Sequence, residues 1–148
     1  MFKPKKVLVP TDFSDYSAKA LERAVDIAKQ NGSELVLLHI VDPDIQTCSI
    51  DYCLQKDEVK KLEKAMLAGA QDRLQKEVSK LSLPSELKIS TEVRKGIPYE
   101  EILKFCDLKK VDLIVIASHG RSAIAKYFLG SVSSRVLKGA RCEVLLVK

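Results

Sequence analysis

The chain has 148 residues, 46% of them hydrophobic and 30% charged, which is the composition of a water-soluble globular protein. Its formal net charge of +5 is spread over scattered lysines and arginines, without the basic stripe and interleaved aromatic residues of a nucleic-acid-binding surface. No apolar run is long enough to span a membrane and no secretory signal is evident, so we expect a single cytoplasmic domain over residues 1–148.

Hydrophobic periodicity alternates between strand and helix patterns along the chain. Continuous apolar or β-branched runs indicate buried strands, whereas apolar residues three and four positions apart indicate helices. In chain order the patterns predict a strand at 5–10, a helix at 16–30, a strand at 34–41, a helix at 56–83, an edge strand at 86–94, a helix at 99–108, a strand at 111–118, a helical turn within 122–129, a helix at 131–139 and a strand at 142–148.

Capping residues and prolines mark the helix boundaries. Ser14 is the expected N-cap of the first helix, and Asn31-Gly32 tolerates the positive φ of a C-cap. Pro84 is expected to end the second helix, and Pro98 stands at a first-turn position of the third. Five strands alternating with helices predict an α/β fold, a three-layer, doubly wound, five-stranded parallel sheet.

The four cysteines do not have the spacing of a metal site. No Cys-x-x-Cys occurs, and neither histidine lies near a cysteine pair at zinc-ligand spacing. Cys106 and Cys142 fall in apolar segments and are expected to be buried as small hydrophobic residues. Cys48 and Cys53 share a predicted loop, where they could approach each other. We therefore expect no bound structural metal.

Two loops are candidates for a ligand site. In a sheet of this type, ligands bind beyond the carboxyl ends of the strands, where the strand order reverses. One loop follows the first strand at 10–14, and the other follows the fourth strand at 117–131. Gly120 lacks Cβ and can bring bare backbone close to an anion, and Gly130-Ser131 begins a helix whose free amides and positive dipole end favour a phosphate.

The same residues also have a purely structural interpretation. Gly120 would then form a turn, Ser131 would cap the last helix, and Asp12 would cap the first. His39 lies inside an apolar strand and is expected to be a hydrogen-bonded core histidine, whereas His119 adjoins the second loop and could touch a ligand. Local chemistry alone leaves the two interpretations open.

Several common motifs are missing from the sequence. There is no Gly-x4-Gly-Lys-Ser/Thr loop to place a lysine between nucleotide phosphates, and no Gly-x-Gly-x-x-Gly follows the first strand. Neither a Gly-x-Ser-x-Gly elbow nor a His-Glu-x-x-His motif occurs. We identify no base for in-line attack on a phosphate, so a fast enzyme is not expected.

Three segments together resemble the universal stress protein family, and the resemblance covers essentially the whole chain. They are Pro-Thr-Asp-Phe-Ser after the first strand, Leu-Leu-His-Ile-Val-Asp at the second, and the tail from residue 116 to residue 148. The ATP-binding branch of that family carries Gly, two residues, Gly, nine residues, then Gly followed by Ser or Thr. Gly120 and Gly130-Ser131 match this pattern, but Ala117 replaces the first glycine.

The resemblance implies a strand order of 3-2-1-4-5, as in adenine nucleotide alpha hydrolase-like folds. It implies ATP as the ligand, with Mg²⁺ or Mn²⁺, with Asp12 beside the adenosine, Thr11 near the phosphates and Ile40 or Val41 at the adenine. The methyl group of Ala117 is expected to weaken or preserve nucleotide binding rather than abolish it. The nucleotide-binding residues expected on this basis are Pro10, Thr11, Asp12, Ile40, Val41, Ala117, Ser118, His119, Gly120, Arg121, Gly130, Ser131, Val132 and Ser133.

Three functions remain open from the sequence. The first is a homodimeric ATP-binding module for stress response or signalling, paired through the apolar strand at 142–148. The second is a slow ATPase or phosphotransfer protein that uses Asp12 and a divalent ion. The third is an interaction-only stress protein in which Ala117 has ended nucleotide binding. Neither a nucleic acid nor a membrane is expected as a partner.

Overall fold

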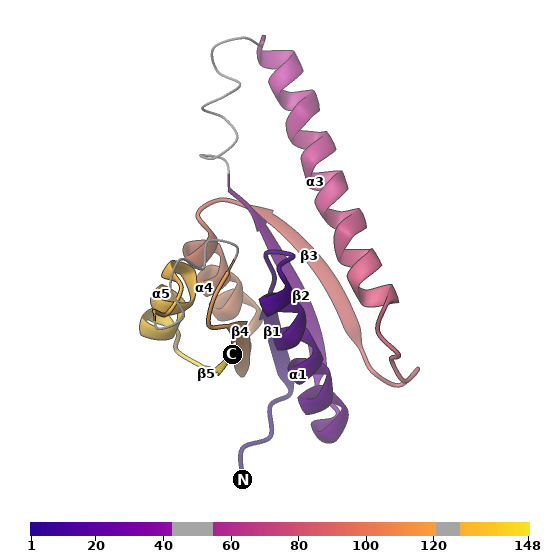
Figure 1. Ribbon diagram of the computed structural model, residues 1–148, viewed down its shortest axis with the longest axis vertical. Helices are drawn as coiled ribbons and strands as arrows, with labels where there is room; N and C mark the ends of the chain where they lie inside the picture. Colours follow the sequence, from indigo (N-terminus) through magenta and orange to yellow (C-terminus); the bar gives the residue numbers. More distant parts are fainter. Residues whose placement is uncertain (43–54, 121–127) are drawn as a thin grey trace.

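The computed structural model describes residues 1–42, 55–120 and 128–148 (Figure 1). Cys48 and Cys53 lie outside these ranges, and so does most of the helical turn expected within 122–129. In chain order the elements are β1 (Lys6–Pro10), α1 (Asp15–Asn31), β2 (Glu34–Val41), α3 (Lys56–Ser79), β3 (Ile89–Lys95), α4 (Pro98–Lys109), β4 (Leu113–Ala117), α5 (Ser131–Gly139) and β5 (Glu143–Val147).

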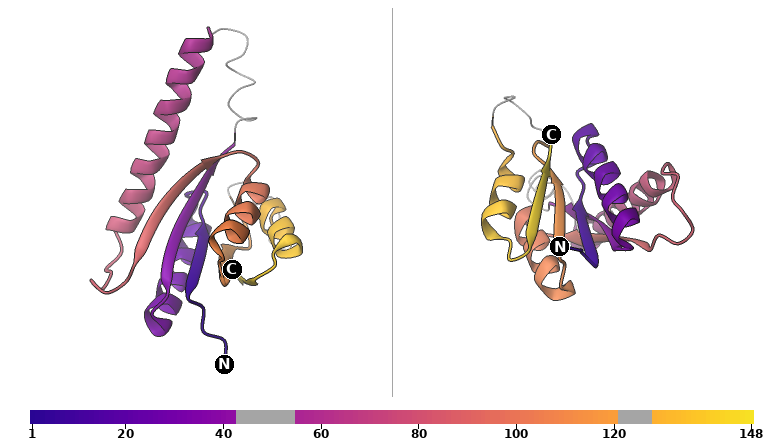
Figure 2. Two further views of the ribbon diagram at one scale, coloured as in Figure 1. Left: turned by 180° about the vertical axis from the view of Figure 1, so that it is seen from behind. Right: turned by 90° about the horizontal axis from the view of Figure 1, so that it is seen from below.

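The five strands form one sheet in the order β3-β2-β1-β4-β5, and every neighbouring pair is parallel. Helices α1 and α3 cover one face of the sheet, and α4 and α5 cover the other (Figures 1 and 2). The prediction of a three-layer doubly wound sheet with order 3-2-1-4-5 is therefore confirmed. The order reverses at β1 and β4, so the loops after these two strands meet at one edge of the sheet.

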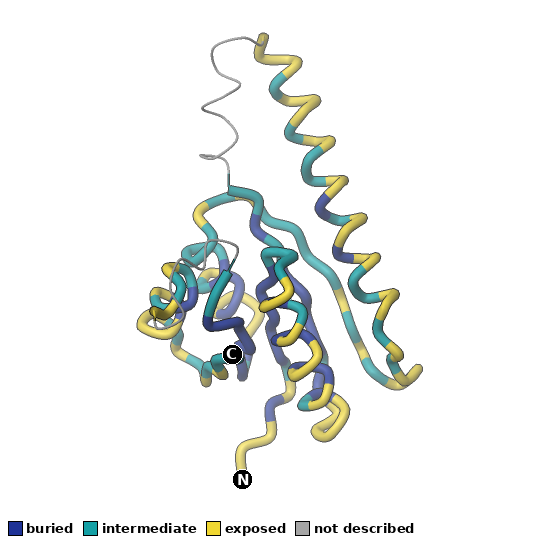
Figure 3. The backbone as a smooth tube through the Cα atoms, in the orientation of Figure 1, coloured by how far each residue is buried: buried dark blue, intermediate teal, exposed yellow. Residues whose placement is uncertain are grey.

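The central strands are apolar throughout because both of their faces are covered. Val7 and Val9 of β1 pack against α1, whereas Leu8 between them packs toward α4, and all three are fully buried. Alternate side chains of a strand point to opposite faces, so a strand with a helix layer on each side shows a continuous apolar run. Figure 3 shows this buried centre, with the exposed residues concentrated on the outer helices.

Two boundaries differ from the sequence-based prediction by more than two residues. The helix expected to reach residue 83 ends at Ser79, and the strand expected from residue 86 begins at Ile89. Leu81 and Leu83 continue the apolar spacing of α3, but they pack against the α1-side core from the connection instead of from a helix. Leu87 donates its backbone N–H to the Pro84 carbonyl, which turns the chain before β3 begins. Apolar periodicity thus overestimated the length of the helix.

The predicted caps are present. The Ser14 side chain accepts a hydrogen bond from the Ser17 amide at 3.2 Å, and Gly32 takes a left-handed conformation with φ of 68°. Pro98 is the first residue of α4. No helix in the described ranges is both long and apolar enough to cross a lipid bilayer.

Candidate functional site

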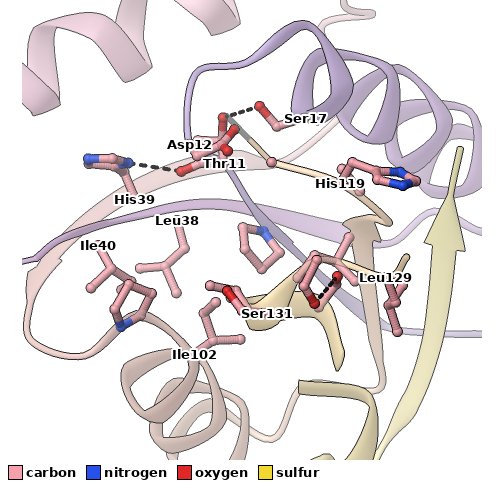
Figure 4. Close-up of a pocket in the computed structure, with 18 of the residues that line it drawn as sticks. Thr11, Asp12, Ser17, Leu38, His39, Ile40, Ile102, His119, Leu129 and Ser131 are labelled. Carbon is pink, nitrogen blue, oxygen red and sulfur yellow. Dashed lines mark hydrogen bonds between the residues drawn. The ribbon is translucent and has the colours of Figure 1, made fainter. Parts of the chain in front are cut away.

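A cavity of about 670 Å³ opens at the carboxyl ends of β1 and β4. Figure 4 shows Leu38, Ile40 and Ile102 along one side of it, opposite Thr11 and Asp12. Eleven of the fourteen residues expected from the sequence line this cavity. They are Pro10, Thr11, Asp12, Ile40, Ala117, His119, Gly120, Gly130, Ser131, Val132 and Ser133.

The other three expected residues lie elsewhere. Val41 lines an adjoining cavity of about 680 Å³, which shares a wall with the first. Ser118 is buried behind the wall, where its carbonyl oxygen accepts hydrogen bonds from the Gly130 amide at 2.8 Å and the Ser133 hydroxyl at 3.1 Å. Arg121 lies outside the described residues. Ser118 therefore holds the second loop against the start of α5.

Asp12 and Gly120 bring the two loops into contact. A Cβ added at Gly120 would stand 2.7 Å from Asp12 Oδ2, so no other residue fits there without moving the carboxylate. The other oxygen of the carboxylate, Oδ1, accepts the Ser14 amide at 3.0 Å. Asp12 therefore supports the start of α1, as its structural interpretation anticipated, and it also lies close to the backbone of the second loop.

The start of α5 faces the cavity. Gly130 is the N-cap of α5. The amides of Ser131, Val132 and Ser133 lie in the first turn of the helix, where they have no intrahelical acceptor. The Ser133 hydroxyl is turned back onto the Gly130 and Ser118 carbonyl oxygens. These amides, with the positive end of the helix dipole, form a site suited to an anion.

Thr11 is the centre of a hydrogen-bond network beneath the first loop. Its amide donates to the Leu38 carbonyl at 2.8 Å, and its hydroxyl lies 2.9 Å from the Ser17 hydroxyl. The same hydroxyl donates to the Glu77 carboxylate of α3 at 3.5 Å and accepts the Phe13 amide at 3.1 Å. Because Thr11 is buried, these contacts fix the loop that carries Asp12.

Phe13 has an unusual backbone conformation. Its φ is 62°, a left-handed value that is an outlier for an aromatic residue and costs on the order of 1–3 kcal/mol. The Phe13 ring packs against His39, with centroids 4.4 Å apart and ring planes tilted by 39°, and the Arg73 guanidinium lies 4.0 Å above the Phe13 ring centroid. These contacts of Phe13 stabilise its conformation and join α3 to the wall of the cavity.

The Glu77 carboxyl, a member of this hydrogen-bond network, makes the stability of the protein depend on pH. Burial raises the pKa of Glu77 above its ordinary value near 4.5, despite the opposing charges of Lys80 and Arg73 and the hydrogen bond from Thr11. The folded state therefore binds more protons than the unfolded state above pH 4.5, and this carboxyl makes stability fall as pH rises through the raised pKa.

Replacing Glu77 with Gln should remove that decline. The melting temperature of the Glu77→Gln variant should fall less between pH 4 and pH 7 than that of the wild type, because the neutral amide has no charge to desolvate. Thermal unfolding followed by circular dichroism at several pH values measures the difference, with Glu86→Gln, at an exposed position, as the control. Identical pH profiles for Glu77→Gln and wild type would rule out this role for the carboxyl.

The two histidines occupy different surroundings. His39 is hydrogen-bonded as expected, with Nδ1 2.8 Å from the Thr11 carbonyl oxygen, but it lies at the wall of both cavities and not in the core. His119 Nδ1 lies 2.9 Å from the Ser118 hydroxyl, and its ring packs against Tyr16 of α1. Its Nε2 is buried and, among the described residues, has no hydrogen-bond partner.

Several apolar residues of the cavity were missed by sequence reasoning. Leu38 lies two residues before Ile40 and therefore on the same face of β2, a relation that the period of a strand could have revealed. Ile102 comes from α4 and Ile116 from β4, and only the packing of the layers brings them to this cavity. Phe128 and Leu129 border it from the second loop.

The comparison that decides the family covers nearly the whole chain. A family model described as "Universal stress protein family" matches residues 3–148. The chain belongs to the universal stress protein family. The universal stress protein MJ0531 of Methanocaldococcus jannaschii is 36% identical over 144 residues, which cover 97% of this chain and 82% of that protein.

Solved universal stress proteins share the fold. UspA from Lactobacillus plantarum aligns with a TM-score of 0.81 and 27% identity over 100% of both chains. A universal stress protein in complex with cAMP aligns with a TM-score of 0.63 and 27% identity, over 99% of this chain and 98% of that one. An adenine nucleotide is therefore a ligand of at least one structural relative of this universal stress protein.

Proposed function

We propose that this protein is a cytoplasmic, homodimeric universal stress protein that binds ATP at the carboxyl ends of β1 and β4 and acts as a stress-response or signalling module. The observation that carries the proposal is the close approach of the Asp12 carboxylate to Gly120, where an added Cβ would have to displace that carboxylate. It brings a carboxylate, a bare glycine and the open first turn of α5 to the edge of one cavity.

The cavity has a separate place for each part of a nucleotide. The apolar side formed by Leu38, Ile40 and Ile102 suits an adenine ring. Asp12 can accept hydrogen bonds from ribose hydroxyls, and the first turn of α5 with Gly120 can receive phosphate oxygens. We assign these roles to the lining residues as part of the proposal.

The charge of the phosphates needs a counter-ion beyond the helix dipole. No lysine or arginine is among the described residues that line the first cavity, while Arg73 and Arg135 line the adjoining one. Over the described ranges, no three His, Cys, Asp or Glu side chains gather as metal ligands. We propose that Mg²⁺ or Mn²⁺ enters with the phosphates and neutralises part of their charge.

Ala117 stands where the family motif has its first glycine. Its side chain is buried in the α1-side core and also borders the cavity. Replacing Ala117 with Gly should tighten ATP binding about fivefold, roughly 1 kcal/mol, because the methyl group narrows the approach to the ligand. Titration calorimetry with ATP measures the change. Equal or weaker affinity in a folded Ala117→Gly protein would show that the methyl group does not restrict binding.

A slow ATPase is the second candidate, because Asp12 is a carboxylate at the same cavity. Typical enzymes turn over at about 10 s⁻¹. We expect a rate far below that with ATP and Mg²⁺ or Mn²⁺, because the sequence carries no motif that places a lysine between the phosphates or a base for attacking water. Release of inorganic phosphate measures the rate. If turnover is near 10 s⁻¹ and disappears in Asp12→Ala, the protein is an enzyme and the proposal of a binding module is wrong.

A further inference from the structure

Two cysteine thiols meet where α4 approaches the start of β5. The sulfur atoms of Cys106 and Cys142 lie 3.0 Å apart, and both thiols are free. A disulfide bond is about 2.0 Å long, so an approach of about 1 Å would join them. The side chains of Asp107 and Arg141, the neighbours of the two cysteines, lie 3.9 Å apart across the same junction. The pair is thus held close by elements that are 36 positions apart in the chain.

The two thiols differ in their exposure. Cys106 is 3% exposed and belongs to the core cluster on the α4 side of the sheet, whereas Cys142 is half-buried at the edge of that cluster. Burial, with the neighbouring Cys142 thiol and the charges of Asp107 and Asp112, raises the pKa of Cys106 to about 12. Only Cys142 is therefore placed to react first with a small molecule from solution.

We propose that Cys106 and Cys142 form a reversible intramolecular disulfide when the protein meets a peroxide. The Cys142 thiolate attacks one oxygen of hydrogen peroxide and becomes a sulfenic acid, and the other oxygen leaves as hydroxide and takes a proton to form water. The Cys106 sulfur then attacks the Cys142 sulfur, gives up its proton and releases a second water. The two thiols are oxidised, and one peroxide molecule is reduced to two molecules of water.

The bond would enclose the segment that carries the second loop of the candidate site. The ring from residue 106 to residue 142 contains β4, the loop from Gly120 to Gly130, and α5. Cys142 packs toward the α4 side with Val144 and Leu146, so its reaction does not require the outer edge of β5. Oxidation would tie the two ends of this segment together and oppose its separation from the sheet.

The test uses a Cys48→Ser/Cys53→Ser protein, which keeps only the pair of interest among the four cysteines. Treatment with hydrogen peroxide should lower the intact mass by about 2 Da, the mass of two hydrogens, and remove both titratable thiols. The melting temperature should rise by roughly 5–10 °C, and dithiothreitol should reverse all three changes. Peptide mapping of the oxidised wild-type protein, which keeps all four cysteines, gives an independent measurement of the same linkage.

Single-cysteine variants separate this proposal from general oxidation. In a Cys142→Ser version of the same protein, Cys106 should remain a thiol because peroxide cannot reach it. In a Cys106→Ser version, Cys142 should stop at the sulfenic acid, which a sulfenic-acid-reactive dimedone probe detects. The proposal would be overturned if both thiols of the Cys48→Ser/Cys53→Ser protein stayed free after peroxide treatment, or if the disulfide linked two chains. It would also be overturned if Cys106 or Cys142 of the wild type were joined to Cys48 or Cys53.

Discussion

Replacing Gly130 with Val should weaken ATP binding at least about 100-fold, roughly 2.7 kcal/mol. A Cβ at this position would stand 3.1 Å from Ser133 Oγ and 3.3 Å from the Ser118 carbonyl oxygen, and valine adds two further carbons. The added side chain would push the start of α5 away from the loop after β4. It would also strain the 2.8 Å hydrogen bond from the Gly130 amide to Ser118, so the anion site would open.

The loss must be separated from unfolding. Overpacking costs typically about 1–3 kcal/mol, so the melting temperature should fall while the circular dichroism spectrum keeps its shape. Gly130→Ala, which adds only the crowded Cβ, should bind with intermediate affinity, and it provides the same test if the valine protein does not fold. Ala68→Val, at an exposed position of α3, is the matched control and should leave ATP affinity unchanged. Unchanged affinity in a folded Gly130→Val protein would dismiss the site.

Proline at Leu146 should convert the proposed homodimer into monomers. The Glu143 amide donates to the Asp112 carbonyl and the Val147 carbonyl accepts the Ser118 amide, so the amides of residues 143, 145 and 147 point toward β4. The amides of Val144 and Leu146 then point to the outer edge. In the described part of the chain no strand pairs with that edge, which leaves it free for a second copy.

Sedimentation at micromolar concentration measures the effect. The wild type should sediment at about twice the 16.5 kDa mass of one chain, and Leu146→Pro should sediment as a single chain because it lacks one edge donor. Leu146→Ala loses the packing of the side chain but keeps the amide, so it should remain dimeric. Leu145→Pro breaks the β4–β5 ladder instead and should cost about 1–3 kcal/mol of stability. A monomeric wild type would rule out the homodimer. A folded Leu146→Pro protein that remains dimeric would show that the interface lies elsewhere.

Local patterns predicted most of the fold correctly. The continuous apolar runs at β1, β2 and β4 indicated strands covered on both faces, and the alternation of strands and helices indicated parallel pairing. The pattern failed at Leu81 and Leu83, which bury their side chains from a connection. The apolar pattern also could not give the register of β5 against β4. That register decides whether the amide of residue 145 or of residue 146 points to the free edge, and therefore which proline substitution tests the interface.

The candidate site was predictable in its backbone and much less so in its side chains. Gly120 and Gly130 could be chosen because phosphate cradles need bare backbone at strand ends, whereas Asp12 was expected at the ligand only from the family resemblance. Ile102 could not be chosen, because it reaches the cavity from a helix whose orientation depends on packing. The closeness of Cys106 and Cys142 likewise depends on how α4 meets β5.

Equilibrium binding of ATP to protein stripped of nucleotide is the most direct test of the proposed function. Calorimetric titration with ATP and Mg²⁺ should show one site per chain with a Kd on the order of micromolar. The nucleotide released from freshly purified, denatured protein should be identified by mass spectrometry as an adenine nucleotide. No binding of ATP to folded protein up to about millimolar concentration, with or without Mg²⁺ or Mn²⁺, would contradict the account.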